Sequence, residues 1–169
     1  MGSTALQAWK QRIFQFQQQV RQTPALTQGT LFTPQEPSAA PPLDPWTIDP
    51  FQLPPQNTEF WRGQFENKGG AALYFVIDDE LPLLLYVGET ITANQRWKGE
   101  HDCKRYLQHY LAAHRPHQLP VAVNIRFWPH APRDRRARQK LELALIQKWR
   151  SPFNKENWEL WATPFVGEF

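Results

Sequence analysis

Cysteine is almost absent from this sequence of 169 residues, and long apolar runs are absent altogether. The single Cys103 excludes an intramolecular disulfide and a zinc cluster built on several cysteines. No apolar stretch approaches the roughly 18 residues that a membrane-spanning helix needs, and the N-terminus lacks the pattern of a signal peptide. We therefore expect a cytoplasmic protein that has no membrane partner.

Net charge is also small, at +3, but it is unevenly distributed. Residues 1–68 contain five basic and five acidic residues, so the whole positive excess lies in residues 69–169. A local excess of positive charge is a mild indication of an anionic partner. Aromatic residues are plentiful, at 14% with eight tryptophans, which is enough for a packed core.

An amphipathic helix is predicted over residues 1–22. Its apolar residues step by three and four positions, which places them on one helical face: Leu6, Trp9, Ile13, Phe16 and Val20. Thr4 followed by Gln7 fits a capping box at the start of this helix. We expect the helix to fold back on the rest of a mainly monomeric protein, and a dimer or protein partner bound through this helix is the alternative.

Proline dominates the next part of the chain, and residues 23–58 hold nine of the sixteen prolines. Proline fixes φ and lacks an amide hydrogen, so this segment forms neither a long helix nor a central strand. A disordered linker would be poor in aromatic residues, whereas Phe32, Trp46 and Phe51 recur here. We predict that residues 23–68 form an extended strap that lies partly on the body of the protein.

The remaining residues, 69–169, read as one small α/β (α+β) domain with an aromatic C-terminal tail. Strands are expected near 71–77, 83–87 and 121–128, and helices over 93–113 and from Pro132 to Arg150. The order is β-β-α-β-α. Three strands make a small sheet, mixed or antiparallel, flanked by helices.

Five motifs in this domain occur in a characteristic order. Ala-Leu-Tyr (72–74) and Tyr-Val-Gly (86–88) lie on the two strands of the hairpin. They are followed by Arg96, by Glu142 within the last predicted helix, and by Asn154 after it. This set resembles the GIY-YIG nuclease domain over roughly residues 70–158.

The resemblance implies a metal-dependent endonuclease that hydrolyses DNA, with RNA left open as a substrate. Glu142 would hold a single Mg²⁺ or Mn²⁺, and Arg96 would bind phosphate. Tyr74 would accept a proton from water, Tyr86 would orient groups by hydrogen bonding, and Asn154 would hold the site together. Gly88 would serve a structural role in its motif. Alternatives are a nucleic-acid-binding module that has this fold but little activity, and a scaffold that binds proteins through the N-terminal helix.

Two positions depart from the family pattern. Ala72 replaces the glycine of the first motif, which costs little in ordinary β conformation. Glu100 stands where many members carry tyrosine or histidine, and His101 comes one residue later. One residue is about 100° around a helix, so His101 is a further catalytic candidate only where the helix is locally irregular.

The last predicted helix is strongly basic. Such a run of basic residues is usually a solvated helix face. Beside a metal site, binding to the phosphate backbone of a nucleic acid is the better interpretation. The side chains predicted to contact nucleic acid are Arg133, Arg135, Arg136, Arg138 and Lys140. No separate target-recognition segment is apparent, so we expect cutting directed by nucleic-acid structure, as in repair, recombination or defence.

Overall fold

The computed structural model describes residues 1–23, 43–57, 69–93 and 102–164. Its α-helices and β-strands in chain order are α1 (Ser3–Gln22), β1 (Gln56–Asn57), β2 (Ala72–Asp78), β3 (Leu83–Thr90), α2 (Asp102–His114), β4 (Val123–Trp128), α3 (Arg135–Trp149) and α4 (Trp158–Trp161). None of the helices in these four ranges is both long enough and apolar enough to cross a membrane.

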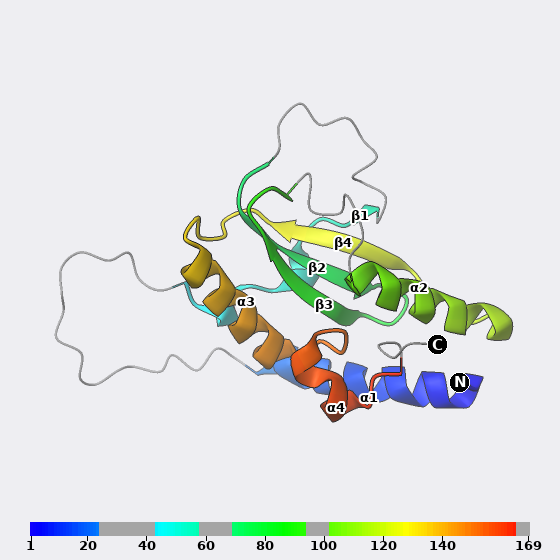
Figure 1. Cartoon of the computed structure of the whole chain (residues 1–169). Coiled ribbons are helices and arrows are strands. Elements are labelled where there is room, and N and C mark those ends of the chain that lie inside the picture. Colours follow the sequence, from blue (N-terminus) through cyan, green and yellow to red (C-terminus); the bar gives the residue numbers. More distant parts are fainter. Residues whose placement is uncertain (24–42, 58–68, 94–101, 165–169) are drawn as a thin grey trace, which may run out of the picture.

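A small antiparallel sheet forms the centre of the molecule (Figure 1). Its strand order is β1-β4-β2-β3, and every neighbouring pair is antiparallel. The predicted α/β fold with three main strands is thus confirmed, in its antiparallel form. The two-residue β1 was not predicted, because proline-rich flanks hide so short a strand.

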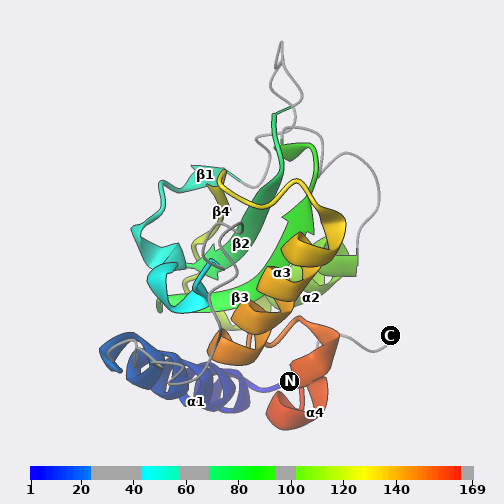
Figure 2. The same ribbon diagram turned by 90° about the vertical axis from the view of Figure 1, so that its left-hand side faces the viewer.

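Helices cover both faces of this sheet, as Figure 2 shows with α3 on one side of β3 and α2 on the other. Alternating residues of β2 face the two layers. Tyr74 and Val76 pack in the cluster that contains α1 and α2, whereas Phe75 and Ile77 pack in the cluster that contains α3. All seven residues of β2 are consequently buried.

A β-bulge in β3 changes which side its residues face. Val76 is opposite Tyr86, but the next residue, Ile77, is opposite Leu84, so Leu85 is the extra residue. Leu84 packs on the α3 side, while Leu85 and Tyr86 both pack on the α2 side. The bulge therefore turns Leu85 to the α2 side, next to Tyr86. Tyr86 itself shares a face with Tyr74 because it is opposite Val76, two residues along β2 from Tyr74.

Helix α1 packs on the same core as the sheet, as predicted. Leu6, Trp9 and Ile13 are buried in the α2-side cluster. The Trp9 indole Nε1 donates to the carbonyl of Trp161 at 3.0 Å. Figure 1 shows α1 passing beneath the sheet next to α4.

The start of α1 differs from the prediction. Its N-cap is Gly2, and no side chain provides a cap hydrogen bond. The expected capping box at Thr4 was wrong, because the helix begins at Ser3 and Thr4 already lies inside its first turn. The apolar face of the helix, which includes Leu6, Trp9 and Ile13, holds it against the core without help from a side-chain cap.

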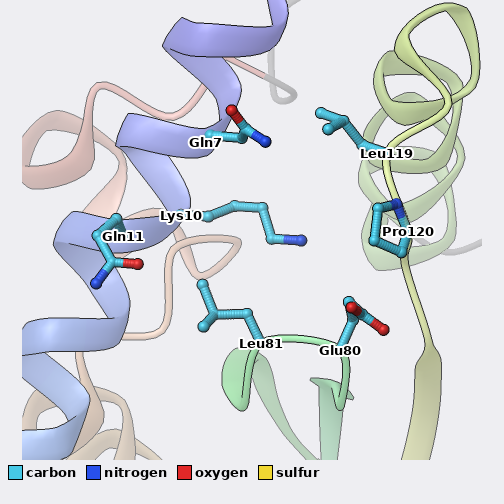
Figure 3. Close-up of a pocket in the computed structure, with 7 residues that line it drawn as sticks. All are labelled: Gln7, Lys10, Gln11, Glu80, Leu81, Leu119 and Pro120. Carbon is cyan, nitrogen blue, oxygen red and sulfur yellow. The ribbon is translucent and has the colours of Figure 1, made fainter.

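Buried polar groups also attach α1 to the sheet. Lys10 Nζ lies 2.9 Å from Asp78 Oδ2, which also accepts from the Tyr110 hydroxyl at 2.7 Å. The same amine lies 3.2 Å from His114 Nε2, and burial lowers the pKa of His114, so a neutral imidazole can accept from Lys10. Figure 3 shows Lys10 extending from α1 toward the space between Leu81 and Pro120.

The described part of the proline-rich strap, residues 43–57, packs against the core cluster that contains α3. Ile48 is buried in that cluster, and the Phe51 ring lies 5.5 Å from the Trp149 ring. Lys148 Nζ donates to the carbonyls of Pro45 and Ile48 at 3.1 and 3.3 Å. The prediction that the strap lies on the body is confirmed for these residues, whereas 24–42 and 58–68 lie outside the described part of the chain.

Candidate active site

A pocket of about 360 Å³ opens beside the outer edge of β3, between α2 and α3. Three of the predicted site residues line it: Tyr86, Glu142 and Asn154. They come from β3, α3 and the turn after α3, so folding alone brings them together. The other described residues that line the pocket are Asp102, Tyr106, Gln139, Leu143, Ile146, Phe153, Lys155 and Glu156.

Helix α3 presents one face to this pocket. Gln139, Glu142, Leu143 and Ile146 are spaced by three and four residues, so they are neighbours on the helix surface. Asp134 caps the start of the helix, where its Oδ1 accepts the Ala137 amide at 2.8 Å, and Arg150 caps its end in the left-handed conformation with φ 48°. The helix ends therefore set the place of Glu142, which is half-buried.

The two motif tyrosines stack against each other, but only Tyr86 reaches the pocket. Their ring centroids are 5.9 Å apart, and a hydrogen bond joins their side chains. Tyr74 is fully buried behind Tyr86. Among the described residues, Tyr86 is therefore the member of the pair that meets the pocket.

Gly88 is required by the position of Tyr74. The two residues are directly opposite in the β2–β3 pair. A Cβ atom on Gly88 would lie 2.6 Å from Cε1 of Tyr74 and nearer still to Cζ and the hydroxyl. Glycine at position 88 thus makes room for the tyrosine ring, which gives the Tyr-Val-Gly motif a steric explanation.

Burial raises the pKa of the Tyr86 phenol well above its ordinary value. Neighbouring Tyr74, Cys103 and Glu142 raise this pKa further, since their negative forms would repel a phenolate. At neutral pH the Tyr86 hydroxyl is therefore protonated and can donate a hydrogen bond. Positive charge in the pocket would be needed before Tyr86 could act as a base.

The side-chain amide of Asn154 pairs with the backbone of β3 at its outer edge, as a neighbouring strand would. Its Oδ1 accepts from the Val87 amide at 3.0 Å, and its Nδ2 donates to the Val87 carbonyl at 2.9 Å. The Ser151 hydroxyl donates to Oδ1 at 2.6 Å and so orients the amide. Val87 lies between Tyr86 and Gly88, hence Asn154 fixes the backbone of the second motif.

The structure differs from the prediction that Arg138 contacts nucleic acid. Its side chain is buried and forms an ion pair with Glu89 of β3. The guanidinium also donates to the carbonyls of Pro132 and Arg133, both at 3.0 Å. A group held in this way joins α3 to β3 and is not available to phosphate. Arg133, Arg135, Arg136 and Lys140 are exposed, as a role in binding would require.

Arg96 and His101 fall within residues 94–101, outside the described part of the chain, and so does Glu100. Two carboxylates of the pocket were not singled out from the sequence. Glu156 follows Asn154 in the same turn, and Asp102 begins α2. Their closeness in sequence to His101 and Asn154 is the signal that could have indicated them.

The donor chemistry of the pocket fits one hard divalent cation. Glu142 supplies a carboxylate, and Mg²⁺ is commonly held by one or two carboxylates together with water and phosphate oxygens. Among the residues that the structure describes, no group of three or more histidine, cysteine or acidic side chains could form a complete cage. The residues present thus suit a cation that the substrate helps to bind.

Comparison with known proteins agrees with this geometry. A family model, described as the GIY-YIG catalytic domain, matches residues 71–157. No curated protein and no solved structure matches the chain significantly. Since the matched segment is just over half of the 169 residues and extends from the start of the β2–β3 hairpin past Asn154, this chain belongs to the GIY-YIG nuclease family.

Proposed function

We propose that this protein is a metal-dependent endonuclease that cuts DNA at positions set by nucleic-acid structure. The observation that carries the proposal is the pocket in which Tyr86, Glu142 and Asn154 meet beside the buried Tyr74. These residues are far apart in sequence, and packing alone gives no reason to gather a phenol and a half-buried carboxylate at one opening. Nucleases of this family generally use a divalent metal ion.

In the proposed reaction one hydroxyl of the tyrosine pair first loses its proton to solvent. The resulting phenolate then accepts a proton from a water whose oxygen attacks phosphorus. The new P–O bond forms, and the bond to the leaving oxygen breaks with its electron pair. That oxygen then takes a proton from solvent. Tyr86 faces the water and Tyr74 supports it through their hydrogen bond, while Arg96 is assigned to the phosphate by its motif.

Glu142 is proposed to hold a Mg²⁺ or Mn²⁺ ion, which would neutralise developing negative charge and lower the pKa of nearby groups. Asn154 acts as a positioning residue, because its amide is occupied by Val87 and Ser151. The exposed Arg133, Arg135, Arg136 and Lys140 are proposed to bind the phosphate backbone on either side of the cut.

The proposal is tested with a panel of substrates that share one sequence: single-stranded, duplex, nicked, flapped and four-way junction DNA, and the matching RNA. We expect cleavage of branched DNA with Mg²⁺ or Mn²⁺ and none with chelator. Binding of DNA without cleavage under any of these conditions would indicate the binding module instead. Cleavage that persists in chelator would contradict the metal requirement.

The role of the tyrosine pair is tested by Tyr74→Phe, which removes only a hydroxyl. We expect the fold to survive and the cleavage rate to fall by about 10² or more, the scale for loss of a general base. Because the two hydroxyls are hydrogen-bonded, Tyr86→Phe should cost a similar factor, and the double variant little more than either single one.

Tyr106→Phe provides the matched control, since Tyr106 lines the same pocket and no part of the reaction is assigned to it. Its rate should stay near that of the wild type. Full activity of Tyr74→Phe, measured under single-turnover conditions, would reduce Tyr74 to a packing residue.

A further inference from the structure

Leu143 is an apolar side chain on the exposed surface of α3. Its exposed fraction is 42%, and it lies outside the buried face of α3, which consists of Arg138, Leu141, Leu145, Ile146 and Trp149. A single exposed leucine is ordinary on a protein surface. What distinguishes Leu143 is its position, because it lines the candidate active site and directly follows Glu142.

The pocket has two chemically different sides. Tyr86, Glu142 and Asn154 supply polar groups, as a phosphodiester requires. Leu143, Ile146 and Phe153 add an apolar surface. Ile146 and Phe153 are buried, so Leu143 is the part of this surface that extends into solvent at the rim.

A nucleic-acid strand presents the same two chemistries side by side. Its phosphates are polar and charged, whereas the flat faces of its bases are apolar. In duplex DNA those faces are covered by stacking, and proteins that expose them insert apolar side chains such as leucine between base steps. Separating a stacked step costs a few kcal/mol in general, and least where the base is already unpaired.

We propose that Leu143 contacts the face of the base next to the scissile phosphate, and that the preferred DNA therefore has an unpaired base at the cut, as at a flap or branch point. This rests on the proposed nuclease function and adds a residue that determines its specificity. The exposed basic side chains of α3, Arg135, Arg136 and Lys140, are suited to hold the flanking phosphates.

The test compares Leu143→Ala with Leu160→Ala. Leu160 is a matched control because it is 49% exposed, lies on α4 and does not line the pocket. Cleavage is measured on two DNAs of one sequence, a flap and a nicked duplex. Leu143→Ala should lower kcat/KM for the flap by about tenfold or more, the size of one lost base contact, and should narrow the preference for flap over nicked duplex. Leu160→Ala should change neither.

A second measurement does not depend on cleavage. The flap DNA carries 2-aminopurine at the base next to the cut, and binding is followed in chelator. We expect fluorescence to rise with the wild-type protein and with Leu160→Ala, to rise much less with Leu143→Ala, and to recover with Leu143→Met. Both alanine variants should keep the wild-type melting temperature within a few degrees, since the side chains are exposed.

The outcomes separate the two proposals. If the wild type cuts DNA but Leu143→Ala and Leu160→Ala behave alike, the contact to the base is overturned and the nuclease function stands. If the wild type cuts nothing, the proposed function fails, and the fluorescence change still decides the role of Leu143. An unchanged signal with Leu143→Ala overturns that role in either case.

Discussion

Replacing Glu142 by glutamine is expected to abolish phosphodiester cleavage while leaving the fold and DNA binding intact. The amide has nearly the shape of the carboxylate but cannot hold a hard divalent cation well. Loss of the cation removes several kcal/mol of charge stabilisation, so the rate should fall by about 10³ or more. Affinity for DNA should stay near the wild-type value or rise, because one negative charge is removed.

The pocket itself provides controls for this variant. Asp102 and Glu156 also line it, and both are exposed. Asp102→Asn and Glu156→Gln remove the same charge at the same opening, and we expect each to keep most of the activity. Rates are compared at several Mg²⁺ concentrations. A normal rate for Glu142→Gln, or a larger loss in either control, would move the cation to another residue.

Replacing Trp9 by alanine should lower the free energy of unfolding by about 3–5 kcal/mol, the range for loss of a buried tryptophan. Trp9 is 3% exposed, packs in the core cluster that contains Tyr74, and hydrogen-bonds to the carbonyl of Trp161. The change would therefore leave a cavity and an unpaired carbonyl at the junction of α1 with α4. The measurement is chemical denaturation of the purified protein.

Trp46→Ala is the matched control, because Trp46 is 44% exposed, and its effect should stay within about 0.5 kcal/mol. The melting temperature of the wild type should not depend on protein concentration if α1 completes the core of a monomer. A melting temperature that rises with concentration, or a dimer that Trp9→Ala converts to monomer, would support the alternative in which α1 binds a partner.

Several elements of the fold followed directly from local sequence patterns. The steps of three and four among Leu6, Trp9 and Ile13 predicted α1 and its buried face, because helical periodicity is a local property. The strands of the hairpin and the basic helix were recognisable for the same reason. Proline content predicted that the strap would form neither a long helix nor a central strand, since proline acts on its own φ angle. The described strap is not simply extended, because it contains two short 3-10 helices, Pro45–Thr47 and Pro50–Gln52.

The site was predictable only where residue type and spacing carried the information. Order and spacing of the motifs were enough to select Tyr86, Glu142 and Asn154, which the structure brings into one pocket. Arg138 shows the limit of this approach. In sequence it is one more basic residue of a charged helix, and only its pairing with Glu89 across the fold removes it from the surface.

The sequence by itself thus determined the family, the main elements and the candidate chemistry, because motifs and periodicity are written along the chain. The tertiary structure decided which groups face the same space. The register of the β2–β3 pair places Tyr86 on the side of Tyr74, and the Asn154 amide secures that strand at Val87. The packing of α3 beside β3 likewise placed Leu143 at the rim of the pocket. Such placements depend on contacts between distant segments, which no local pattern encodes.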